Sequence, residues 1–125
     1  MPEFLNPFSG KVPDRKLTNS ELIRAIRLNI AAEHEAVHLY MSHADATDHP
    51  LAKEVLIDIA NEERVHIGEF ERLIEVLSGD EAKFIAEGRE EVDEMIEEMG
   101  GAAAAPESDA SAGGDEASTI GSLKE

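Results

Sequence analysis

The fold of this chain is decided by residues 55–73, which read VLIDIANEERVHIGEFERL. Residues on one side of this segment recur every three or four positions, the period of one face of an α-helix. That face comprises Val55, Ile59, Glu63, His66, Phe70 and Leu73. Glu63 and His66 interrupt an otherwise hydrophobic stripe and lie side by side, because they are three residues apart. The segment therefore predicts a helix that carries a carboxylate and an imidazole on its apolar face.

The same period predicts a helix from Pro50 to about Leu77. Proline is tolerated in a first helical turn, and Asp48 is the expected N-cap. Leu51 and Leu77 extend the predicted stripe at its two ends, and Leu56 and Ile74 widen it.

A preceding helix is predicted to begin at the capping-box sequence TNSE, residues 18–21, and to end near Ala46. Its stripe consists of Leu22, Ile26, Ile30, Val37 and Tyr40, and Glu33 falls on the same face. Only the short segment 47–50 separates the two helices, so they are expected to form an antiparallel hairpin.

A break and a second capping box are predicted at residues 78–81, followed by a shorter, acidic helix at 81–99. Its apolar residues are Phe84, Ile85, Val92, Ile96 and Met99. No segment alternates as a strand would. We therefore expect an all-α fold: an antiparallel two-helix hairpin and a shorter C-terminal helix.

Four regions follow from the composition. Residues 1–17 are expected to form an extended arm and residues 18–99 the helical domain, whereas residues 100–117 have the small and polar composition of a flexible linker. Residues 118–125 form a terminal peptide. Ile120 and Leu123 are the only large apolar residues after Met99, so this peptide either reaches a groove elsewhere or is a frayed terminus.

The helical domain is small and the chain has no cysteine, so self-association is expected to enlarge its core. The absence of cysteine excludes disulfides, thiolate zinc sites and thiolate-bound iron–sulfur clusters. A net charge of −17 without a basic stripe argues against nucleic acid. Residues 1–13 lack the pattern of a signal peptide and no apolar run is long enough to cross a bilayer, so a cytosolic protein is expected.

Counting metal ligands explains the polar residues on the stripes. Di-iron carboxylate bundles use one glutamate from each of two helices and a Glu-x-x-His pair from each of two others. This chain supplies half of that set: Glu33, Glu63 and His66. Two copies related by a two-fold axis would complete it around two ions, which could be iron, manganese or zinc. The alternative is a buried ion pair with an arginine, but Arg24, Arg27 and Arg64 do not fall on these stripes.

Other polar residues carry weaker signals. Glu35 and His38 form a second Glu-x-x-His pair, on a face away from Glu33, where solvated surface is the favoured interpretation. His34, His43 and His49 are expected at the surface. Tyr40 is expected in the core with its hydroxyl near the site.

Two motifs then resemble those of a known family. EHEAVHLY at 33–40, followed by NEERVH at 61–66, resembles the encapsulated ferritins, half-bundle relatives of ferritin and rubrerythrin. The terminal STIGSLKE, residues 118–125, is similar to peptides that load cargo into encapsulin shells. The likeness covers about residues 17–77 and the last eight residues, and the combination of the two motifs makes it specific.

The resemblance implies a ferroxidase centre between two subunits that form a ferritin-like four-helix bundle. Glu33 and His66 would be terminal ligands and Glu63 a bridge between two irons. It also implies assembly of dimers into a decamer, and packaging in an encapsulin shell through Ile120, Gly121, Ser122 and Leu123. Glu35 matches an acidic position that guides metal inward. Ala32 and Leu39 depart from the acid and the aromatic of some members, and His38 is a candidate substitute on that access route.

Three other functions use the same features. The same ligands could serve a rubrerythrin-like peroxidase or a manganese catalase, although rubrerythrins commonly add a cysteine-bound iron domain that is missing here. The third is a metal-free helical adaptor that only occupies a shell.

Overall fold

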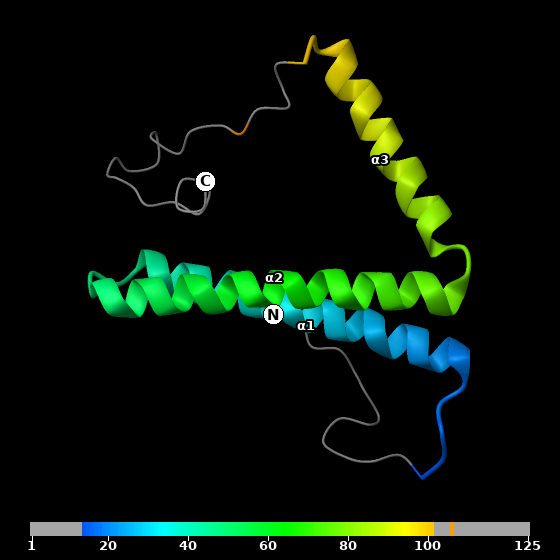
Figure 1. The fold of residues 1–125 in the computed structure, drawn as a ribbon, viewed down its shortest axis with the longest axis horizontal. Helices are drawn as coiled ribbons and strands as arrows, with labels where there is room; N and C mark the ends of the chain where they lie inside the picture. The colour runs from blue at the N-terminus through cyan, green and yellow to red at the C-terminus, as the bar shows by residue number, and fades with distance from the viewer. Residues whose placement is uncertain (1–13, 102–105, 107–125) are drawn as a thin grey trace.

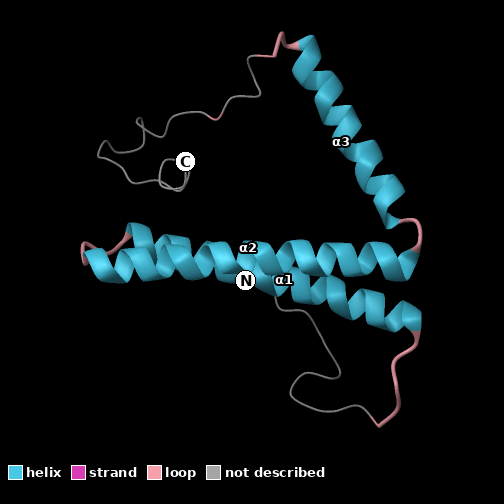
Figure 2. Cartoon of the chain, in the orientation of Figure 1, coloured by secondary structure: helices cyan, strands magenta, loops and turns pink. Residues whose placement is uncertain are grey.

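The computed structural model describes residues 14–101 and residue 106, and three helices account for most of them. These helices are α1 (Asn19–Asp45), α2 (Pro50–Ser78) and α3 (Glu81–Glu98). Helices α1 and α2 lie side by side as an antiparallel hairpin, and α3 leaves the end of α2 in a different direction (Figures 1 and 2). The described residues contain no strand. The predicted all-α hairpin with a shorter third helix is confirmed, whereas most of the arm and linker and the whole terminal peptide lie outside the described residues.

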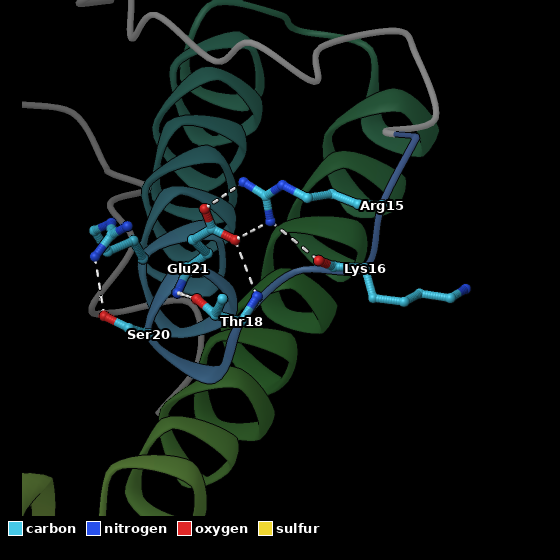
Figure 3. Close-up of polar contacts among 6 residues, drawn as sticks. Arg15, Lys16, Thr18, Ser20 and Glu21 are labelled. Carbon is cyan, nitrogen blue, oxygen red and sulfur yellow. Dashed lines mark hydrogen bonds and ion pairs between the residues drawn. The ribbon is translucent and has the colours of Figure 1, made fainter.

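The start of α1 is a complete capping box (Figure 3). The backbone N–H of Glu21 donates to the Thr18 hydroxyl at 3.1 Å, and the Thr18 N–H donates to the Glu21 carboxylate at 2.9 Å. Arg15 adds two hydrogen bonds of 2.8 Å to the same carboxylate. These bonds stabilise the ionised carboxylate, with Arg15 the largest cause, and lower the pKa of Glu21 to about 2.

The connection between α1 and α2 differs from the prediction in its cap. The N-cap is His49, not Asp48: the His49 Nδ1 accepts a hydrogen bond of 3.3 Å from the Ala52 N–H. The reason is Pro50 at the first helical position, because the residue before a proline is held in extended backbone, as an N-cap requires. The Lys53 ammonium also donates to the Ala44 carbonyl at 2.7 Å, which ties the two helix ends together.

The core lies between α1 and α2. Its buried residues are Ile26, Met41, Ala44, Ile57, Ala60, Ile67 and Ile74. Val37, Tyr40 and Leu56 pack around the part of this core nearest the connection. No polar side chain is buried among the described residues. The hairpin is therefore held by a narrow apolar seam.

The predicted stripe of α2 describes this seam only in part, because only two of its residues, Ile74 and Leu56, lie in the seam or pack against the core there. Leu51, Val55, Ile59 and Leu73 are 65%, 45%, 36% and 41% exposed, and the side that contacts α1 is Ile57, Ala60, Ile67 and Ile74. Helix α2 thus has two neighbouring apolar faces. We call the uncovered one, formed by Leu51, Val55, Ile59, His66 and Leu73, the outer face of α2.

The stripe of α1 is also only partly correct. Ile26 is buried as predicted, but Leu22 remains exposed, and Ile30, Val37 and Tyr40 are only partly buried. Met41 and Ala44 are buried although the predicted stripe did not include them. These two buried residues of α1 therefore lie closer to the connection with α2 than the predicted stripe does.

Helix α3 contributes no buried residue. Gly79 ends α2 with a φ of 82°, a left-handed conformation that favours glycine. The Ser78 hydroxyl then accepts hydrogen bonds from the Glu81 and Asp80 N–H groups at 3.0 and 3.3 Å. The predicted capping box is not formed, because the N-cap of α3 is Asp80, whose side chain makes no cap hydrogen bond, and the Glu81 carboxylate binds Arg27. In the described part of the chain, no helix is both long and apolar enough to cross a membrane.

Truncating Ile74 should destabilise the hairpin, because this side chain is 1% exposed at the seam. We expect the Ile74→Ala variant to lose about 3 kcal/mol of unfolding free energy, from lost burial and the cavity left behind. Urea unfolding at one fixed chain concentration measures it. Val76→Ala is the control, since Val76 is 62% exposed. An equal loss in both variants would contradict the assigned seam.

Candidate metal centre

Three potential metal ligands meet in the middle of the hairpin: Glu33 from α1, and Glu63 and His66 from α2. Glu33 and Glu63 each lie fifteen residues from Asp48 in the connection, so an antiparallel hairpin places them opposite each other. His66 lies one helical turn after Glu63, on an adjacent position of the α2 surface. One ligand atom from each residue lies within 4.8 Å of the other two. Within residues 14–101, this is the one such group of three or more potential ligands.

The imidazole of His66 hydrogen-bonds the Glu63 carboxylate and lies near the Glu33 carboxylate. Its Nδ1 is 3.0 Å from Oε1 of Glu63 and 3.6 Å from Oε2 of Glu33. The two glutamate side chains are 20% and 18% exposed, whereas the His66 side chain is 50% exposed. The carboxylates are therefore partly enclosed by the hairpin, and the imidazole projects from the outer face of α2.

No arginine neutralises the cluster. Arg24 donates to Ser20 and Arg64 donates to Asn61, each on its own helix. Arg27 binds the carboxylate of Glu81. The alternative interpretation of a buried ion pair with one of these arginines is thus excluded, and within residues 14–101 the two carboxylates pair only with His66.

The protonation of the three groups is coupled by their hydrogen bonds. The pKa of Glu33 is raised because it hydrogen-bonds Glu63, with partial burial and the neighbouring negative charge as further causes. The pKa of Glu63 is lowered by the hydrogen bonds from Glu33 and then from His66. The hydrogen bond to Glu63, together with the charges of Glu33 and Glu63, raises the pKa of His66. The neighbouring carboxylates therefore favour protonation of Glu33 and His66, and a bound cation would compete with those protons.

The donor set fits a divalent metal ion. Two carboxylates and one imidazole suit iron, manganese or zinc, and among the described residues no ammonium or guanidinium forms an ion pair with these carboxylates. Three residues leave coordination positions open on the side where His66 is exposed. The arrangement can thus hold an ion while a further ligand approaches from outside the hairpin.

The other predicted site residues are not members of this three-residue group. Glu35 is partly buried and His38 is exposed, and neither belongs to the cluster. Tyr40 packs against the core cluster of Met41, Ala44, Ile57 and Ala60. Ile120, Gly121, Ser122 and Leu123 lie outside the described residues. All three histidines that were predicted to lie at the surface, His34, His43 and His49, are exposed. His49 is also the N-cap of α2, and Pro50 after it was the sequence signal for that cap.

Comparison with known proteins gives concordant matches. The rubrerythrin family model matches residues 24–99, which include all three ligands and α3. The encapsulin nanocompartment cargo protein EncC of Myxococcus xanthus is 41% identical over 127 residues, covering 95% of this chain and 96% of that protein. A ferritin-like–encapsulin shell fusion protein of Pyrococcus furiosus is 35% identical over 82 residues, covering 66% of this chain and 24% of the fusion protein.

A solved structure extends the comparison to three dimensions. The crystal structure of the encapsulated ferritin domain from Pyrococcus furiosus matches with a TM-score of 0.65 and 34% sequence identity. The match covers 73% of this chain and 92% of that domain. The helical arrangement is therefore shared with that domain.

Metal binding at this cluster should release protons and weaken as the pH falls. A metal needs the free imidazole nitrogen, and the raised pKa of His66 keeps its proton to higher pH. We expect Zn²⁺ affinity to drop as the pH falls through the raised pKa of His66, measured by calorimetry in two buffers with different ionisation enthalpies. The free energy of unfolding of the metal-free chain should instead rise as the pH falls. The His66 proton stabilises it fully below the unfolded pKa of 6.5 and loses its effect as the pH rises through the folded value.

The exposed His34 offers a matched control for this titration. A His34→Gln variant should keep the proton release, because His34 is outside the cluster. Zn²⁺ binding with no proton release at pH 7 would contradict the assigned site.

Proposed function

The chain belongs to the rubrerythrin family and, within it, to the ferritin-like cargo proteins of encapsulins, and from this premise we propose that it is a ferroxidase. Its substrate is Fe(II), which it oxidises to Fe(III) for storage inside an encapsulin shell. The observation that carries the proposal is the cluster of Glu33, Glu63 and His66, in which two carboxylates face each other with an imidazole and no arginine.

Two copies complete the site in this proposal. Each copy offers one Glu33 and one Glu-x-x-His pair, which is half of the ligand set of a di-iron bundle. A two-fold axis beside His66 provides two copies of each ligand for two ions. Glu63 then bridges the ions, and Glu33 and His66 are their terminal ligands.

The outer face of α2 supports pairing at that position. His66 lies on this face with Leu51, Val55, Ile59 and Leu73, which are all exposed in the single chain. Covering these apolar residues and completing the metal site require the same contact. Two hairpins joined there make a ferritin-like four-helix bundle, and in this proposal such dimers assemble further into a decamer.

The chemistry needs two electrons from a pair of Fe(II) ions. With dioxygen as the acceptor, two electrons and two protons give hydrogen peroxide and leave two Fe(III) ions. The residues bind the substrate ions in competition with protons, because the pKa values of Glu33 and His66 are raised, and their carboxylates are hard donors that favour the ferric product. Glu35 and the exposed His38 guide cations toward the centre. Manganese or zinc can occupy the same donors.

The encapsulin shell protein is the proposed partner, and the C-terminal peptide is the proposed contact. Residues 100–117 serve as a flexible linker that lets residues 118–125 reach a shell groove while the helical domain stays free. Ile120, Gly121, Ser122 and Leu123 form the part of the peptide that the shell recognises. The protein then works inside a nanocompartment in the cytoplasm, where the product iron collects.

The family match also supports a second function, a rubrerythrin-like peroxidase, which would use the same three ligands. A manganese catalase is a related alternative. Metal analysis after growth with added iron or added manganese separates the catalase and a structural adaptor from the two iron enzymes, because stoichiometric manganese would favour the catalase and no bound metal would favour the adaptor.

Removing the bridging carboxylate should abolish ferroxidase activity. We expect Glu63→Ala to lose both irons and to oxidise Fe(II) no faster than buffer, measured by oxygen consumption and Fe(III) absorbance. Glu62→Ala is the matched control, because the neighbouring Glu62 is exposed and outside the cluster. Oxidation at the parent rate by the Glu63 variant would refute the assignment.

Deleting residues 118–125 should prevent packaging without changing iron oxidation. We expect the truncated chain not to copurify with the encapsulin shell after coexpression, as judged by gel analysis of isolated shells. A chain with the same eight residues in scrambled order controls for length. Normal loading of either variant would show that the shell recognises another part of the chain.

A further inference from the structure

The junction of α2 and α3 is an elbow built from contacts between distant parts of the chain. Gly79 turns the backbone, and the Ser78 hydroxyl caps the first turn of α3. The Asn19 side chain at the start of α1 donates to the Leu77 carbonyl at 3.1 Å. The ends of all three helices therefore meet at one place.

One ion pair connects the hairpin to α3 across this elbow. Both terminal nitrogens of the Arg27 guanidinium donate to the Glu81 carboxylate, at 2.8 and 3.0 Å. The Glu81 side chain is only 19% exposed, although that of Arg27 is 52% exposed. Exposed ion pairs are usually weak, but a bidentate arginine–carboxylate pair fixes the orientation of both groups.

Helix α3 has little else to hold its direction. None of its residues is buried, and the contact of Lys83 with Phe84 lies within α3 itself. Among residues 14–101, Arg27–Glu81 is the only ion pair that joins α3 to the hairpin. Without it, α3 would be attached to the hairpin mainly through the backbone of the elbow.

The same ion pair also fixes the rotation of α3 about its own axis. An apolar stripe runs along one side of α3. It contains Phe84, Ile85, Val92, Met95 and Met99, all exposed. Helical spacing places Glu81 on the same side as Val92 and Met99. Anchoring Glu81 to α1 therefore sets the side to which the whole stripe points.

We propose that the Arg27–Glu81 ion pair is an elbow lock that fixes the direction and rotation of α3, so that every copy presents the α3 stripe in one orientation. Arg27 and Glu81 are positioning residues and take no part in the metal centre. The inference does not depend on the proposed ferroxidase function, because it concerns the metal-free chain.

Distance measurements by pulsed electron resonance test the lock directly. The chain has no cysteine, so nitroxide labels on Gly68→Cys in α2 and Glu90→Cys in α3 report one distance. Both positions are exposed, and a side chain at Gly68 meets no neighbouring atom. Labelled full-length chains are diluted into unlabelled chains so that the distance is measured within one chain.

We expect a single narrow distance peak in the parent and its loss in both Arg27→Gln and Glu81→Gln. The control Arg24→Gln should keep the narrow peak, because Arg24 hydrogen-bonds only Ser20 on its own helix. The swapped variant Arg27→Glu/Glu81→Arg should recover it. Unchanged peaks in the two single variants would overturn the lock. So would failure of the swap to recover the peak, since the loss would then not come from the ion pair.

Discussion

The central constraint on this structure is the meeting of two carboxylates on facing helices with no arginine to neutralise them. Glu33 and Glu63 lie opposite each other in the hairpin, and His66 lies 3.0 Å from one and 3.6 Å from the other. His66 hydrogen-bonds Glu63, and the raised pKa values of Glu33 and His66 mean that both groups keep a proton to higher pH than they would alone. In the proposed site a cation competes with those protons for the same groups. Metal binding there would therefore be coupled to proton release.

The second constraint is that α2 has more apolar surface than α1 can cover. Ile57, Ala60, Ile67 and Ile74 fill the seam, and the outer face of α2 stays exposed around His66. A domain of this size cannot readily tolerate such a face in water. Because the imidazole belongs to that face, the exposed apolar surface and the group of potential metal ligands lie at the same place. This coincidence is the physical basis for proposing a site shared between two copies.

Local sequence signals predicted the helices well. The Thr18–Glu21 capping box, the proline at 50 and the glycine at 79 mark helix ends that the structure reproduces within one or two residues. The spacing of Glu63 and His66 placed both on neighbouring positions of one helix. Sequence could not tell which of two adjacent apolar faces of α2 meets α1, because both have helical period. It also could not find Arg27–Glu81, since a contact across 54 positions depends on where α3 goes.

The account is tested most directly by native mass spectrometry of the metal-loaded full-length chain. It predicts one metal ion per chain in dimers or larger even-numbered assemblies, and no monomer that holds two metal ions. Leu73→Lys, on the outer face but away from the ligands, should give monomers that lose the paired ions, whereas Gly68→Lys should keep them, because a side chain there meets open space. A monomer that holds two ions by itself would contradict the shared site.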